Sequence, residues 1–189
     1  MRIVAGALRG RPLVAPPGRG TRPTADRARQ ALFDVLAHAD WAPPLAGARV
    51  LDLFAGSGAL GFEALSRGAA FALFVETEEA ARGAIRDNAD ALGVMGAVRM
   101  HRRDATDLGD RPGAAGGVFS LALLDPPYAL GLGERALASL ASGGWLAADA
   151  VAVFERGRDE PDPDTPGWEL LDVRAWGAAR VLFLRATAP

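Results

Sequence analysis

The sequence contains no cysteine and no lysine, and it has only two histidines. The absence of cysteine excludes disulfides, thiolate metal sites, iron–sulfur clusters and a cysteine nucleophile. His38 and His101 are too few and too isolated to predict a metal site. The chain also lacks the run of roughly 20 apolar residues that crosses a membrane, and its start lacks the long apolar segment of a signal peptide. We therefore expect a cytoplasmic protein with no metal and no membrane partner.

The composition is that of a globular protein, but the charge is unevenly spread. Half of the 189 residues are hydrophobic and 23% are charged, which suits one domain with a buried core. Residues 1–29 hold seven arginines against a single acid, whereas acids outnumber arginines in the rest of the chain. A compositional bias explains the use of arginine over lysine but not this clustering. A basic arm on an acidic body is typical of a phosphate-binding extension, as in proteins that bind nucleic acids.

The chain divides into a basic N-terminal part, residues 1–40, and a second part, residues 41–189. The first 24 residues are rich in Gly, Pro and Arg, and they predict a strand or hairpin-like arm that builds no core. Thr24 is a suitable N-cap for a helix over residues 25–38. On that helix Arg27 and Arg29 are expected to point away from the apolar face.

From residue 48 onward, apolar runs alternate with helical patterns in the βαβ manner. A Pro-rich acidic loop then precedes two strand-like runs around Gly177 that form a hairpin. This order predicts an α/β fold with a doubly wound, seven-stranded, mostly parallel sheet and a terminal antiparallel hairpin. By analogy of fold, that ending is typical of the Rossmann-like sheet of class I methyltransferases rather than of dinucleotide-binding sheets. Strands are predicted near 49–54, 72–76, 97–101, 120–125, 151–155, 168–176 and 180–185, and helices near 59–67, 78–92 and 131–142.

A glycine-rich turn follows the first of these strands, in the segment Asp52-Leu53-Phe54-Ala55-Gly56-Ser57-Gly58. Glycines permit a sharp turn and let a ligand lie against bare backbone at the start of a helix. With Gly61, the glycines also satisfy the G-x-G-x-x-G spacing of NAD-binding proteins. The alternative to a ligand-binding site is a tight structural turn with no ligand. Asp52 favours a nucleoside that carries an amino acid, because a carboxylate suits its ammonium group and is awkward beside a pyrophosphate.

Two further acids come at the ends of the next two strands. Glu76 ends the second strand, where a carboxylate can accept both hydroxyls of a ribose, although it can also be an ordinary solvated acid. Asp104 follows the third strand and is placed to accept the exocyclic amine of an adenine, with Ala105 beside it. Ligands of open α/β sheets bind at the carboxyl edge of the strands. The expected set of residues that bind S-adenosylmethionine is therefore Asp52, Phe54, Ala55, Gly56, Ser57, Gly58, Glu76, Asp104 and Ala105.

The most specific motif is Asp125-Pro126-Pro127-Tyr128, which closes the fourth predicted strand. The amine on a base ring is a poor nucleophile because its lone pair is shared with the ring. A carboxylate and a prolyl carbonyl can accept its two hydrogens and turn the lone pair toward a methyl donor. The prolines stiffen the loop, and Tyr128 can stack on a base that has swung out. The motif predicts that these four residues form the catalytic loop; the alternative is a proline-broken strand end with a core aromatic.

Over nearly its whole length the chain resembles the RsmD family of small-subunit rRNA (guanine-N2) methyltransferases. The resemblance rests on residues 1–6 (Met-Arg-Ile-Val-Ala-Gly), Arg9-Gly10-Arg11, Arg22-Pro23-Thr24, Asp26-Arg27 with Arg29, Leu32-Phe33, 52–61, 63–68 and 125–128. The glycine turn and the Asp-Pro-Pro-Tyr loop belong to amino-methyltransferases at large, whereas the Arg-Pro-Thr segment narrows the choice among the families of these enzymes.

The resemblance implies a substrate, a cofactor and an RNA-binding surface. The substrate would be guanine 966 of 16S rRNA on a partly assembled small ribosomal subunit, and S-adenosylmethionine would supply the methyl group. The basic arm would hold RNA beside the cofactor. The residues expected to contact RNA are Arg9, Arg11, Arg22, Thr24, Arg27 and Arg29.

Three alternatives remain open at this point. A DNA adenine-N6 or cytosine-N4 methyltransferase, or another RNA amino-methyltransferase, would use the same loop, but DNA enzymes usually carry a larger target-recognition region than this length allows. A nicotinamide-dependent oxidoreductase fits the glycine spacing but leaves the Asp-Pro-Pro-Tyr loop unexplained. A non-catalytic RNA-binding module would need only the basic arm. Methylation through a cysteine adduct or an iron–sulfur cluster is disfavoured because the chain has no cysteine.

Overall fold

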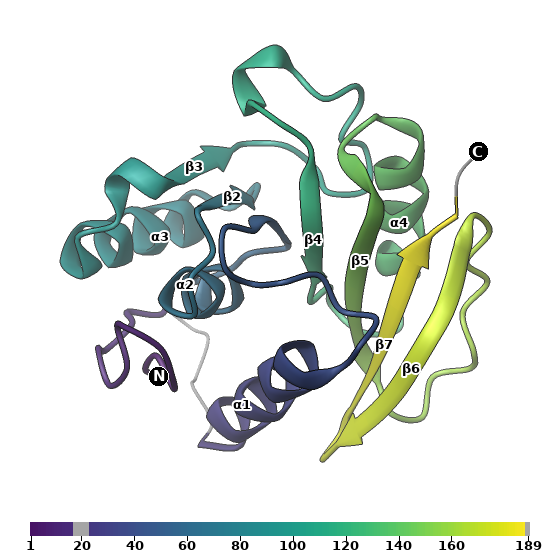
Figure 1. Ribbon diagram of the computed structural model, residues 1–189, viewed down its shortest axis with the longest axis horizontal. Helices are drawn as coiled ribbons and strands as arrows, with labels where there is room; N and C mark the ends of the chain where they lie inside the picture. Colours follow the sequence, from purple (N-terminus) through teal and green to yellow (C-terminus); the bar gives the residue numbers. More distant parts are fainter. Residues whose placement is uncertain (17–22, 188–189) are drawn as a thin grey trace.

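The computed structural model describes residues 1–16 and 23–187, and its centre is a single seven-stranded sheet (Figure 1). The strand order is β3-β2-β1-β4-β5-β7-β6. The first five strands are parallel, whereas β7 runs antiparallel to both of its neighbours. The predicted doubly wound sheet with a terminal antiparallel hairpin is confirmed. The strands span Arg49–Leu53, Phe71–Val75, Val98–His101, Phe119–Leu124, Leu146–Gly157, Trp168–Trp176 and Ala179–Ala186.

Helices cover both faces of the sheet. The helices α1, α2, α3 and α4 span Pro23–His38, Ala59–Ser66, Glu79–Leu92 and Leu132–Ser142, and short 3₁₀ turns lie at Met95–Ala97 and Gly113–Ala115. Alternate strand residues point to opposite faces. Leu51 and Leu53 share one cluster with α4, whereas Val50 and Leu123 share another with α1. Among the described residues no helix has both the length and the apolar character to span a bilayer.

The N-terminal arm contributes to the core, which corrects the expectation from its composition. Residues 1–14 fold back in a hairpin-like way, with an antiparallel bridge between Arg2 and Pro12. Ile3 is fully buried and Leu13 is 6% exposed, and both pack with α2 and α3. The prediction failed because two isolated apolar residues in a Gly/Pro/Arg-rich segment show no regular period.

Two side chains of α2 and one of α3 fasten the arm. Glu63 is fully buried, and its carboxylate accepts hydrogen bonds from the backbone N–H groups of Val4 (2.9 Å) and Ala5 (3.0 Å). Ser66 accepts the N–H of Leu8 at 2.9 Å. Asn88 exchanges two hydrogen bonds with the backbone of Val14. The arm is therefore fixed against the body by hydrogen bonds as well as by apolar packing.

The start of α1 differs from the sequence prediction. The helix begins at Pro23, so Thr24 lies in its first turn and not at the N-cap. Proline is well suited to a first helical position because its fixed φ fits a helix and its missing N–H has no partner there anyway.

The fifth strand is longer than predicted. It spans Leu146–Gly157 rather than 151–155, because Leu146 pairs with Phe119 of β4 at its start and β7 pairs with it as far as Gly157.

Candidate active site

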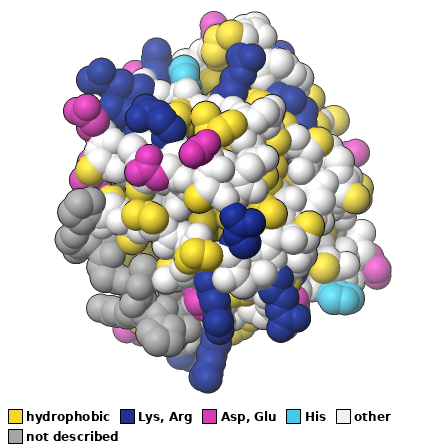
Figure 2. Space-filling view, turned by 90° about the vertical axis from the view of Figure 1, so that its left-hand side faces the viewer, with side chains coloured by type: hydrophobic (Ala, Val, Ile, Leu, Met, Phe, Trp, Pro, Cys, Tyr) yellow, Lys and Arg dark blue, Asp and Glu magenta, His cyan; other side chains and the backbone are white. Residues whose placement is uncertain are grey.

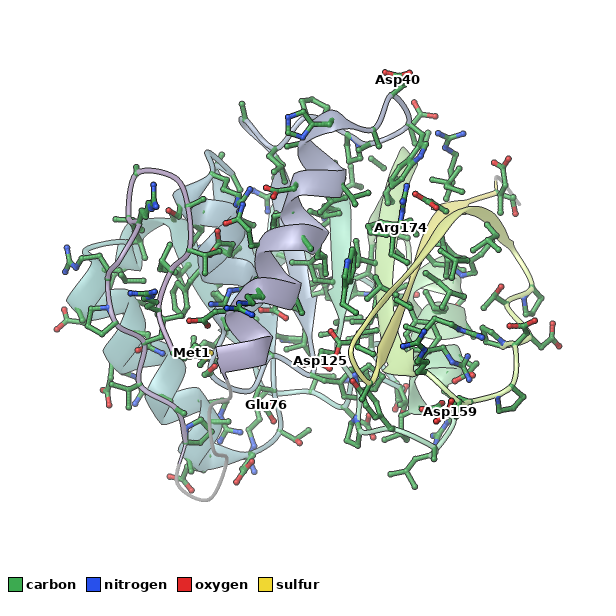
Figure 3. All side chains as sticks on the ribbon, turned by 90° about the horizontal axis from the view of Figure 1, so that it is seen from below. Met1, Asp40, Glu76, Asp125, Asp159 and Arg174 are labelled. Atoms are coloured by element: carbon green, nitrogen blue, oxygen red, sulfur yellow. The ribbon has the colours of Figure 1, made fainter. Side chains whose placement is uncertain are left out.

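Acidic residues meet at the carboxyl ends of neighbouring strands. Asp52 lies in β1, Glu76 directly follows β2, Asp125 directly follows β4, and Glu155 lies near the end of β5. Asp104 comes three residues after β3. Figure 3 shows Glu76 and Asp125 at the same edge of the sheet. The structure thus brings the predicted acids together, and it adds Glu155 to them.

The glycine-rich turn adopts a backbone that few residues tolerate. Gly56 and Gly58 have φ of 56° and 79°, and Phe54 has φ of 58°, which is a strained conformation for a residue with a side chain. A Cβ on Gly61 would lie 2.4 Å from the ring of Phe74 and 3.1 Å from Asp52 Oδ2. Bare backbone is therefore required here, and it brings the start of α2 close to the end of β1.

Asp52 is only 1% exposed and lies at the floor of this turn. Its Oδ2 accepts the N–H of Gly61 at 2.9 Å. Burial raises the pKa of the Asp52 carboxyl well above its ordinary value, and the nearby Asp125 and Glu76 add to the rise. A cation bound next to Asp52 would relieve this unfavourable charge. The arrangement therefore suits the ammonium group of a ligand.

We expect Asp52→Asn to stabilise the protein near neutral pH. The native state holds the Asp52 proton more tightly than the unfolded chain does, so ionising this group lowers the free energy of unfolding as pH rises above the ordinary pKa of 3.8. The amide removes that cost and still offers an oxygen to Gly61. Thermal unfolding should show the difference in Tm between variant and wild type becoming more positive as the pH rises above about 4. A difference that does not change with pH would contradict this account of Asp52.

The larger of two hollows at this edge has a volume of about 620 Å³, which is within the usual range for cofactor sites. Glu76 is held at its rim, since its carboxylate accepts the N–H groups of Gly56 and Glu78, both at 2.9 Å. Asp104 accepts two hydrogen bonds from Thr106, and these lower the pKa of Asp104. The lining comprises Phe54, Val75, Glu76, Thr77, Glu78, Arg103, Asp104, Ala105, Asp125, Pro126, Pro127, Tyr128 and Leu132.

A second hollow of about 320 Å³ adjoins the first, and Phe54 and Asp125 line both. Its lining comes from the glycine turn, the arm, α1 and the hairpin. These residues are Met1, Ala15, Pro16, Ala28, Arg29, Leu32, Asp52, Phe54, Ala55, Gly56, Ser57, Ala59, Leu60, Asp125, Glu155, Trp176, Ala179 and Val181. Of the predicted cofactor residues, Glu76, Asp104 and Ala105 line the first hollow, Asp52 and residues 55–57 line the second, Phe54 lines both, and Gly58 lines neither.

The Asp-Pro-Pro-Tyr loop presents its acid between the two hollows. Asp125 is exposed, Pro126 is buried, and Tyr128 is 42% exposed. The Tyr128 hydroxyl donates to Glu155 Oε1 at 2.7 Å, and burial together with this carboxylate raises the pKa of Tyr128. After the loop, the N–H of Ala129 donates to Glu160 at 3.2 Å. The loop is thus held at its far end by two acids.

Glu155 and Glu160 are residues that sequence reasoning missed. Glu155 ends the predicted fifth strand and could have been found by the same rule that identified Glu76 and Asp125. Glu160 lies in the acidic loop, where no sequence signal marks it. Its carboxylate also accepts hydrogen bonds from Arg156 and from the Gly157 N–H.

The arginines of the arm and of α1 do not all lie where they were expected. Arg9 and Arg27 are exposed and line one small hollow between the arm and α1, together with Arg2. Arg11 is also exposed, but it donates to the carbonyl of Ala91 on α3. Figure 2 shows several basic side chains projecting from the side of the molecule that carries the arm. Exposed arginines are therefore present on both the arm and α1.

The position of Arg29 differs from the sequence prediction. It is only 5% exposed, so it does not point away from the apolar face. Its guanidinium pairs with Asp26 at 2.8 Å and with Glu63 at 3.6 Å, and it donates to the carbonyl of Arg2. A buried pair of this kind fastens the arm to α1 and α2. Arg22 lies outside the described residues.

Known proteins resemble this chain over most of its length. The family described as Conserved hypothetical protein 95 matches residues 1–185. The Ribosomal RNA small subunit methyltransferase D of Escherichia coli (strain K12) is 37% identical over 171 residues, which cover 90% of this chain and 82% of that protein. The protein of the same name from Haemophilus influenzae (strain ATCC 51907 / DSM 11121 / KW20 / Rd) is 33% identical and covers 94% of this chain and 89% of its own.

A solved structure agrees with these sequence matches. The structure of yhhF from Escherichia coli superposes with a TM-score of 0.83 at 32% identity, and it covers 100% of this chain and 99% of its own. Sequence and fold therefore lead to the same group of relatives.

Proposed function

Because this chain belongs to the RsmD family of ribosomal RNA small subunit methyltransferases, we propose that it methylates the exocyclic N2 amine of a guanine in 16S rRNA, at guanine 966. The methyl donor is S-adenosylmethionine, and the substrate is an assembling small subunit. The sheet is the Rossmann-like sheet of class I methyltransferases. The observation that carries the proposal is the position of Asp125, which faces a cofactor-sized hollow on one side and a second hollow on the other.

The residues at the larger hollow fit this cofactor. Glu76 is placed for the hydroxyls of a ribose, and Asp104 with Ala105 for an adenine. Asp52 and residues 55–57 line the adjoining second hollow, where an ammonium group would meet a buried carboxylate. Acceptors are thus available for each donor group of the nucleoside and of the amino acid.

The Asp125 loop prepares the target amine for transfer. The Asp125 carboxylate and the Pro126 carbonyl accept the two hydrogens of the amine, and they hold its lone pair in the direction of the larger hollow. S-adenosylmethionine supplies the electrophilic methyl carbon when it is bound there. The buried Pro126 and the bond between Tyr128 and Glu155 keep the loop in place. Asp125 can then receive the proton that the amine releases.

The test of the proposed function is mass mapping of methylated nucleosides in 16S rRNA from cells with and without the gene. We expect one N2-methylguanine to disappear from small-subunit rRNA and to return when the wild-type gene is restored. Loss of N6-methyladenine or N4-methylcytosine from DNA, with rRNA unchanged, would assign the protein to the DNA alternative. Titration of the protein with NAD and with S-adenosylmethionine distinguishes the proposal from the oxidoreductase alternative, because the alternative predicts binding of NAD and the proposal predicts binding of S-adenosylmethionine.

The exposed arginines beside the arm predict a salt-dependent RNA affinity. Exchanging Arg9 and Arg27 together for alanine should remove about two phosphate contacts and lower the salt slope of RNA binding by about 1.5. Filter binding of small-subunit rRNA at several salt concentrations measures this slope. The affinity for S-adenosylmethionine should not change.

Arg174→Ala is the matched control for these two exchanges. Arg174 is an exposed arginine of β6 whose side chain is 53% exposed, and it lies on the other side of the molecule from Met1 in Figure 3. Because the control removes one arginine and the test variant removes two, a change half as large in the control would assign the effect to net charge rather than to this surface.

A further inference from the structure

Two carboxylates stand next to each other at the edge of the second hollow. Leu124 of β4 is paired in register with Phe154 of β5, so Asp125 and Glu155 follow at neighbouring positions on adjacent strands. Adjacent strands lie about 4.8 Å apart, and residues paired across them point to the same face. Both acids line the second hollow. A planar group that enters this hollow therefore meets two acceptors side by side.

We propose that Glu155 reads the target base, accepting the N1–H of guanine while Asp125 accepts a hydrogen of the neighbouring N2 amine. This inference rests on the proposed function and adds to it the residue that selects the base. Guanine carries the N1–H donor and the N2 amine on adjacent atoms of one edge. Glu155 is then a specificity residue that contacts the substrate.

One oxygen of the Glu155 carboxylate is held by Tyr128. Glu155 Oε1 accepts the Tyr128 hydroxyl at 2.7 Å, and this leaves Oε2 for a donor of the base. Burial raises the pKa of Glu155, whereas the hydrogen bond from Tyr128 favours the ionised form and opposes that rise. Tyr128 thus links the loop that presents Asp125 to the acid on the next strand.

Part of the wall of the hollow suits the ring of a base. Leu32 of α1, Trp176 of β6 and Val181 of β7 line it with apolar surface. The polar edge of a base can therefore face the two acids while its ring lies among apolar side chains.

A carboxylate at this position discriminates among bases. Adenine carries an unprotonated ring nitrogen next to its amine, and so does cytosine. That lone pair would face the Glu155 carboxylate without a proton between them. A site built to accept a hydrogen bond rejects analogues that lack the donor, because its buried polar group is left unpaired. The pair of acids thus explains how a loop shared by several amino-methyltransferases is directed to guanine N2.

The experiment compares two target bases in the same small-subunit RNA, partly assembled with small-subunit proteins. One RNA carries guanine at the target position, and the other carries 2,6-diaminopurine, which keeps the 2-amine but has no N1–H. We expect kcat/KM of the wild type to favour guanine by at least about 100-fold. In Glu155→Gln the amide can donate to the unprotonated nitrogen. The preference should then fall at least about tenfold, and the rate on 2,6-diaminopurine should rise.

Glu169→Gln is the matched control, because it removes one carboxylate from the exposed surface of β6, where the Glu169 side chain is 57% exposed. Its base preference should equal that of the wild type. A wild type that methylates neither RNA refutes the proposed function. A wild type that methylates guanine and 2,6-diaminopurine equally, or a Gln variant with an unchanged preference, overturns the role of Glu155 alone.

If Glu155→Gln does not fold, a second variant tests the role of Glu155 in base selection. Thermal unfolding and the affinity for S-adenosylmethionine report whether Glu155→Gln is intact. If it is not, Tyr128→Phe serves instead, since it removes only the hydroxyl that orients Glu155. A smaller preference for guanine in this variant supports the inference, and an unchanged preference overturns it.

Discussion

Asp125→Ala lowers kcat by about 100-fold to 1,000-fold, while the Kd for S-adenosylmethionine stays within about threefold of the wild type. This result follows from the proposed roles, in which the Asp125 carboxylate acts on the target amine and Glu76, Asp104 and Asp52 supply the carboxylates for the cofactor. Asp125→Asn should retain more activity than the alanine variant, because its amide oxygen can still accept one hydrogen. Single-turnover methylation of small-subunit RNA and calorimetric titration of the cofactor measure the two quantities separately.

Asp159→Ala is the control for this substitution, because Asp159 is an exposed acid of the loop after β5. It should leave both quantities unchanged. An Asp125→Ala protein that methylates at the wild-type rate would remove the amine-positioning role from this loop. An Asp125→Ala protein that binds RNA but does not methylate it would show that Asp125 acts in catalysis and not in binding. The alternative of a non-catalytic RNA-binding module predicts that neither the wild type nor any variant methylates.

Glu63→Ala destabilises the protein by about 3–5 kcal/mol, which lowers Tm by about 6–20 °C. Glu63 is fully buried, and its carboxylate pairs with Arg67 at 2.8 Å and with Arg29 at 3.6 Å. Removing it deprives both guanidiniums of this partner and releases the N–H groups of Val4 and Ala5. Denaturant unfolding measures the loss, and proteolysis should cut first within residues 1–16.

Glu169→Ala tests whether any glutamate paired with an arginine has this effect. Glu169 pairs with Arg185 at 3.7 Å on the exposed surface, so its loss should cost at most about 1 kcal/mol. Equal costs for the two variants would show that burial of Glu63 contributes nothing special. Glu63→Gln, which keeps acceptors but not the charge, should fall between them.

The sheet and most of the acids at its edge were predictable because each strand carries a local signal. A buried parallel strand is apolar along its length, so an acid at its end stands out, as Glu76 and Asp125 do. The glycine turn is also a local signal, because its glycines follow one another closely in the sequence. In the structure Gly58 and Gly61 pack tightly against Phe74, which excludes any side chain there. The strand order then follows from the alternation of strands with helices and from the final hairpin.

Features that depend on distant partners could not be predicted. Arg29 looks like a surface residue on a helical wheel, and only the fold shows that Glu63 and Asp26 surround it. The arm lacks a period, yet Ile3 and Leu13 find their places against α2 and α3. Glu155 could be found as an acid at a strand end, but only the strand register shows that it lies beside Asp125, which is 30 residues away in the sequence.

The position of β7 has a consequence for the growing polypeptide. This strand is made after β6, yet it inserts between β5 and β6 and pairs with both. Until residues 179–186 are available, the N–H and C=O groups along one side of β5 have no partner, and an open strand edge readily pairs with another molecule. A chain that stops before residue 179 is therefore expected to aggregate rather than to fold into a smaller soluble sheet, and folding during translation is expected to wait for this last strand.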